Sequence, residues 1–114
     1  MNVLRFLILL FAVSSGVSAQ ECDYPPLVSI PSGADSTMDE LLAAQGAIRE
    51  YMASMNEYMD CVDAELTAAG DDAPEEYKAI MLSRYNAAVA EMETIASDFN
   101  VEVQAYREAN PEGD

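Results

Sequence analysis

Two long proline-free stretches with regularly spaced apolar residues constrain the fold of this chain more than any other feature. Proline is absent from residues 38–73 and again from residues 75–110. In the first stretch, mostly apolar side chains recur at alternating steps of three and four residues, which is typical of a helix that buries one stripe. The stripe consists of Leu41, Gln45, Ile48, Met52, Met55, Met59, Val62, Leu66 and Ala69, with Tyr51 and Tyr58 on one flank.

The second stretch repeats this spacing after a short interruption. Its stripe consists of Met81, Tyr85, Ala88, Met92, Ile95, Phe99, Glu102 or Val103, and Tyr106. Helices are therefore expected over about residues 38–69 and 74–109. Because so short a connection joins neighbours that run in opposite directions, the sequence predicts an all-α fold: a long antiparallel two-helix hairpin within residues 37–110.

Capping signals set the expected helix boundaries. Thr37 and Glu40 form a capping-box pattern at the start of the first helix. Gly70 is placed to end that helix in a left-handed conformation. Asp72 is the expected N-cap of the second helix, with Pro74 inside its first turn. The second helix is expected to stop at the following Asn-Pro pair, which leaves residues 111–114 as a disordered tail.

Residues 1–19 have the pattern of a secretory signal peptide. Arg5 supplies the positive start, Leu4 to Val13 form an apolar run interrupted only by that arginine, and residues 17–19 are a small-residue cleavage site. The run is about ten residues long, too short for the roughly 30 Å core of a bilayer, so an uncleaved anchor is the less favoured alternative. We therefore expect a periplasmic or secreted protein with no stable membrane insertion after cleavage.

Cys22 and Cys61 are the only two cysteines in the chain. Export to an oxidising compartment predicts that they form a disulfide. The alternative is a pair of free or metal-binding thiols, which no other soft ligand accompanies.

Residues 20–36 contain three prolines, which favour an extended arm over a helix. The disulfide is expected to staple this arm to the first helix, where it follows the flank formed by Tyr51 and Tyr58. The apolar arm residues are expected to cover the seam between the helices; they are Tyr24, Leu27, Val28 and Ile30.

The charge balance excludes several classes of function. The chain has 21 acidic and five basic residues, no histidine, and a net charge of −16. Such a chain repels nucleic acid, because binding to phosphates requires lysine and arginine. Without histidine there is no Ser-His-Asp triad and no activated nucleophile, and a two-helix hairpin offers no useful cleft. We therefore expect no enzymatic activity, no catalytic residue and no cofactor.

Methionine and acidic residues raise the alternative of a metal-binding or buffering protein. Met52, Met55 and Met59 share one helical face, and thioether clusters select Cu(I). The acidic side chains, including those of residues 71–76, could hold divalent cations. Adaptable core packing for the methionines and solvated helix faces for the acids are the simpler interpretation, so no metal site is predicted.

Surplus apolar residues point instead to a protein partner. Tyr77, Ile80, Leu82 and Val89 lie outside the predicted seam, and such exposure is typical of an interaction surface. We expect a non-enzymatic interaction or structural module of the bacterial envelope, with a homodimeric four-helix bundle as one form of it. Residues assigned to the interaction surface or core seam are Tyr51, Met52, Met55, Tyr58, Met59, Met81, Tyr85, Met92 and Phe99.

Overall fold

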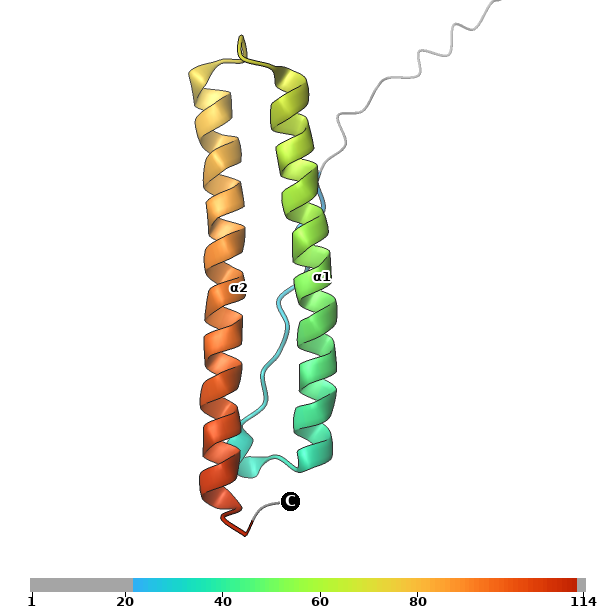
Figure 1. Cartoon of the computed structure of the whole chain (residues 1–114), viewed down its shortest axis with the longest axis vertical. Coiled ribbons are helices and arrows are strands. Elements are labelled where there is room, and N and C mark those ends of the chain that lie inside the picture. Colours follow the sequence, from blue (N-terminus) through green and yellow to red (C-terminus); the bar gives the residue numbers. More distant parts are fainter. Residues whose placement is uncertain (1–21, 113–114) are drawn as a thin grey trace, which may run out of the picture.

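A computed structural model describes residues 22–112 of the chain as a helical hairpin with an N-terminal arm (Figure 1). Its elements are a short 3₁₀ turn η1 (Gly33–Asp35), helix α1 (Met38–Ala69) and helix α2 (Glu75–Ala109). The two long helices lie side by side along their length, and the described residues contain no strand. The predicted all-α hairpin is confirmed, whereas the predicted signal peptide lies outside the described residues.

The start of α1 is fixed by the predicted capping box. The Glu40 backbone N–H donates to Thr37 Oγ1 at 3.2 Å, and the Thr37 N–H donates to Glu40 Oε2 at 3.0 Å. At the other end, Gly70 has the expected positive φ of 74°, but its ψ of 178° is extended. The chain therefore leaves α1 as an extended turn, and a residue without a Cβ is required there.

The predicted N-cap of the second helix is wrong. Helix α2 begins at Glu75, and its N-cap position is held by Pro74 with φ −54° and ψ 139°. The Ala73 N–H donates to the Gly70 carbonyl at 3.2 Å, so residues 71–73 are used to close the turn. Asp72 consequently lies inside the turn, and no side chain caps α2.

The Cys22–Cys61 disulfide is present, with the two Cα atoms 5.6 Å apart. From this link the arm runs obliquely between the helices toward the start of α1 (Figure 1). Val28 and Ile30 pack against the core, whereas Leu27 remains 72% exposed, contrary to prediction. Successive side chains of an extended chain point to opposite sides, which explains why Leu27 faces away.

The arm ends on α2 rather than on α1. Gly33, in η1, is buried, and its N–H donates to Glu102 Oε2 at 3.3 Å. A Cβ at this position would lie 1.7 Å from the Glu102 carbonyl oxygen, so only glycine permits the approach. The arm is thus attached to one helix by a disulfide and to the other by close backbone packing.

The buried core is shifted toward the arm relative to the stripe that the sequence predicted. Tyr51 and Tyr58, expected on the flank, are buried in the seam, while Met52 and Met59 are only partly buried and Ala69 is exposed. The arm shields the tyrosine side of the seam, which is why burial shifts that way. The buried core side chains are Leu41, Ala44, Ile48, Tyr51, Met55, Tyr58, Val62, Met81, Ala88, Ile95 and Tyr106.

Candidate interaction surface

The hairpin has two dissimilar faces on either side of its seam. On the arm face, hollows are lined by arm residues 22–28 together with α1 residues such as Ser54 and Tyr58. On the opposite face, which we call the uncovered face, the hollows are lined by helix residues and by the turn and C-terminal residues that flank them. The described part of the arm covers only the first of these faces.

A small aromatic and polar cluster fixes the arm on its face. The Tyr24 ring meets the Tyr58 ring edge to face, with centroids 4.9 Å apart, and its hydroxyl donates to Glu91 Oε2 at 2.9 Å. Partial burial, this hydrogen bond and the Glu91 charge raise the pKa of Tyr24 to about 12. The Tyr51 hydroxyl is buried without a hydrogen-bond partner, and burial and the Glu91 charge raise its pKa as well.

The raised pKa values of Tyr24 and Tyr51 bear on the acid–base chemistry of the arm face. Both phenols keep their protons at neutral pH, so neither serves as a base, and each is a weaker acid than an ordinary tyrosine. The Glu91 carboxylate accepts the hydrogen bond from the Tyr24 hydroxyl and so links the arm to α2. The cluster therefore holds the arm in place.

The uncovered face is largely apolar. Helical periodicity places two rows of residues beside the seam and two more at the outer edges. The seam rows are Gln45, Met52, Met59 and Leu66 of α1 and Lys78, Tyr85, Met92 and Phe99 of α2, all partly buried. The edge rows are Leu42, Arg49, Asn56 and Asp63 of α1 and Glu75, Leu82, Val89, Ala96 and Val103 of α2.

Charge is distributed very unevenly between this face and the remaining surface. The chain has 21 acidic residues, yet the four rows of the uncovered face contain only two of them, Asp63 and Glu75. With Arg49 and Lys78 this gives the four rows a net charge of 2 − 2 = 0, against −16 for the whole chain. A face with few acids on such a protein is a place where an apolar surface can approach with little like-charge repulsion.

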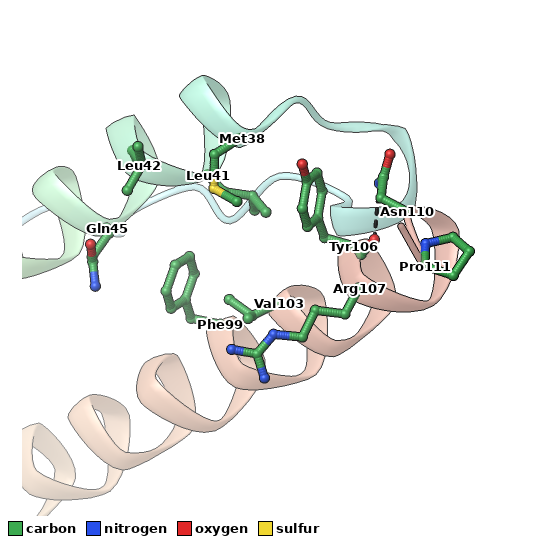
Figure 2. A pocket seen from close by; sticks show the side chains of 10 residues that line it. All are labelled: Met38, Leu41, Leu42, Gln45, Phe99, Val103, Tyr106, Arg107, Asn110 and Pro111. Carbon is green, nitrogen blue, oxygen red and sulfur yellow. Dashed lines mark hydrogen bonds between the residues drawn. The ribbon is translucent and has the colours of Figure 1, made fainter. Parts of the chain in front are cut away.

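The larger of the two hollows of the uncovered face lies at the open end of the hairpin (Figure 2). It has a volume of about 510 Å³. Leu41 and Met38 of α1 face Tyr106 and Phe99 of α2 across it, and Arg107 lies along its rim. The Asn110 side-chain amide donates to the Tyr106 carbonyl at 2.9 Å and closes the end of the groove.

A second hollow, of about 440 Å³, lies at the turn end of the same face. Leu66 of α1 and Leu82 of α2 contribute its apolar wall. Lys78 stands beside them; its ammonium group donates to the Asp71 carbonyl at 2.7 Å and to Glu75 at 3.4 Å. The uncovered face is therefore hollowed at both ends.

The residues assigned from sequence divide between two environments. Four are buried in the seam and unavailable to a partner: Tyr51, Met55, Tyr58 and Met81. Five are partly buried beside the uncovered face: Met52, Met59, Tyr85, Met92 and Phe99. Sequence reasoning placed Val103 in the core stripe, as an alternative to Glu102, whereas Leu82, Val89, Ala96 and Val103 form an edge row with a spacing of seven.

Metal ligands converge at one place in the described residues, at Cys22, Cys61 and Glu65. Since the two sulfur atoms are joined in the disulfide, they are not thiolate ligands there. Met52, Met59 and Met92 are partly buried and pack against the core beside the uncovered face, so the core packing expected for the methionines is only partial. Within residues 22–112, no helix combines the length and apolar character needed to cross a membrane.

Comparison with known proteins gave no match to any protein-family model, curated protein or solved structure.

Proposed function

We propose that this protein is a non-enzymatic, exported interaction or structural module of the bacterial envelope, and that it binds a protein partner through the uncovered face. The observation that supports this most directly is the contrast between a largely apolar face with no net charge and a chain of charge −16. Binding surfaces have apolar centres that are depleted of charged residues and polar rims. The length of α1, at 32 residues, gives the face an extent of about 48 Å.

The disulfide supports export, because such bonds persist in the periplasm and outside the cell. The finer assignment to the periplasm or the medium rests on the signal-peptide pattern of residues 1–19. Fractionation of the native host, with N-terminal sequencing of the purified protein, tests it. We expect a protein that begins at Gln20, outside the cytoplasm; an unprocessed cytoplasmic protein would contradict export.

Site-specific photo-crosslinking in the native host tests the binding face. A benzoylphenylalanine is placed at Tyr85, on the uncovered face, and in a matched strain at Leu27, which is exposed on the arm. We expect a defined crosslinked product from position 85 and none from position 27. Products from both positions, or from neither, would contradict the proposed face.

A second candidate function is binding of Cu(I) by methionine, and it is favoured by one observation. Met52, Met59 and Met92 are partly exposed on a common face rather than fully buried. Thioether ligands prefer Cu(I) over harder cations. Anaerobic titration against a Cu(I) chelator tests this function, with Met52→Leu as the variant and Met38→Leu as the control at the open end of the hairpin. Equal affinity of both variants, or no saturable uptake, would exclude it.

A further inference from the structure

A second copy of the uncovered face has the same low charge and apolar character, and would therefore suit it as a binding partner. We propose that it binds a second copy of this chain, face to face, to form a four-helix bundle about a twofold axis. This inference names the partner in the proposed function and therefore rests on it. The argument uses the charge, the area and the shape of the face.

Charge argues for a partner surface that is itself uncharged. A basic protein would be drawn to the acidic outer surfaces of the hairpin, where most of the described acidic residues lie. Two copies, in contrast, repel each other least where acids are few. The uncovered face combines few acids with large apolar side chains beside the seam, so self-association is expected there.

The area of the face suits a stable dimer. Two packed helices of about 10 Å diameter with axes 8–10 Å apart are about 19 Å wide, so a hairpin about 48 Å long presents a face of about 900 Å². Two such faces give about 1,800 Å² in total, within the usual range for specific complexes. The arm lies on the far side of each hairpin and does not obstruct this contact.

The shape of the face also fits a copy of itself. Met52, Met59 and Met92 are flexible side chains that fill irregular gaps, and the grooves at the two ends leave room for the side chains of a facing helix. The connection between α1 and α2 is short, as are the connections in four-helix bundles that pack antiparallel hairpins in pairs.

Sedimentation equilibrium of the purified, disulfide-linked protein at micromolar concentrations tests the inference. We expect a dimer whose dissociation constant falls as NaCl is raised, because salt screens the repulsion between two acidic copies. A glutamate on the uncovered face, in Met59→Glu or in Leu82→Glu, should weaken the dimer by about 100-fold or more, because it buries an unpaired charge twice per dimer.

Ala53→Glu is the matched control, because it adds the same charge at an exposed α1 position off the uncovered face. We expect it to leave the dimer intact. Leu82 is 55% exposed, so its variant should keep the fold, which circular dichroism verifies. A dimer that survives both uncovered-face variants would overturn the inference. So would a monomeric wild-type protein; if position 85 still crosslinks to a different protein, the second copy is excluded while the proposed function stands.

Discussion

Replacement of Gly33 by alanine tests how the arm is held, because the structure gives this change a definite steric cost. The added Cβ would lie 1.7 Å from the Glu102 carbonyl oxygen, and real Cβ contacts stay beyond 3.0 Å. The backbone of η1 must therefore retreat from α2 by at least 3.0 − 1.7 = 1.3 Å. The Gly33 N–H bond to Glu102 Oε2, already 3.3 Å long, does not survive such a shift.

The expected cost follows from overpacking. Insertion of a methyl group into a closely packed contact costs about 1–3 kcal/mol of unfolding free energy. For a domain of this size, each kcal/mol lowers the melting temperature by about 4–8 °C. Gly33→Ala should thus melt roughly 5–20 °C below the wild-type protein.

Gly46→Ala is the matched control, because a Cβ there meets nothing within 4 Å and the residue lies exposed inside α1. Alanine in a helix interior stabilises by about 0.5–1 kcal/mol relative to glycine, so this variant should melt above the wild type. Both changes stiffen the unfolded chain equally, so their difference isolates the contact with Glu102.

Thermal unfolding followed by circular dichroism at 222 nm gives the comparison, with the disulfide intact and all proteins at one concentration. The steric reasoning requires opposite signs for the two variants. A Gly33→Ala protein that melts at or above the wild-type temperature would refute it, since η1 would then not lie against the α2 backbone.

Three further outcomes are expected. Cys61→Ser should lower the unfolding free energy by about 4 kcal/mol, the entropy of a loop of 39 residues, while helicity is retained; an unchanged denaturant midpoint would show that the staple adds no stability. Thr37→Ala should cost about 1 kcal/mol through loss of the capping box, measured by urea unfolding, and Thr37→Ser should restore most of it. Because the folded pKa of Tyr24 is raised to about 12 from 10, its stabilising contribution is complete below pH 10 and is lost as pH rises toward 12. Titration at 295 nm should therefore show late tyrosine ionisation that moves earlier in Glu91→Gln, and an identical curve for that variant would contradict the assignment.

The helices could be predicted from sequence because their determinants are local. The repeat of apolar residues, the Thr37 capping box and Gly70 act within a few residues of the positions that they control. The disulfide could be predicted because the chain has only two cysteines. The N-cap of α2 was predicted wrongly because two local signals competed, and the turn closed by Ala73 prevailed over capping by Asp72.

The position of the core could not be read from periodicity alone. A heptad pattern with apolar residues on three adjacent rows is compatible with several rotations of the helix about its axis. The rotation is selected by what covers each flank, and here the arm covers Tyr51 and Tyr58 while Met52 and Met59 stay at the edge. The contact of Gly33 with Glu102 joins residues 69 positions apart and has no local signature.

A row of small residues in the sequence indicates on which side of α1 the arm lies. Ala47, Ser54 and Cys61 recur at a spacing of seven on the arm side of α1, where they line hollows together with residues 22–28 of the arm. The equivalent row on the other side begins with Gln45 and continues with methionine and leucine. Small side chains let an extended chain approach the helix closely, whereas long ones leave a flexible apolar surface suited to another helix. The same asymmetry therefore places the arm on one face and leaves the opposite face available to a partner.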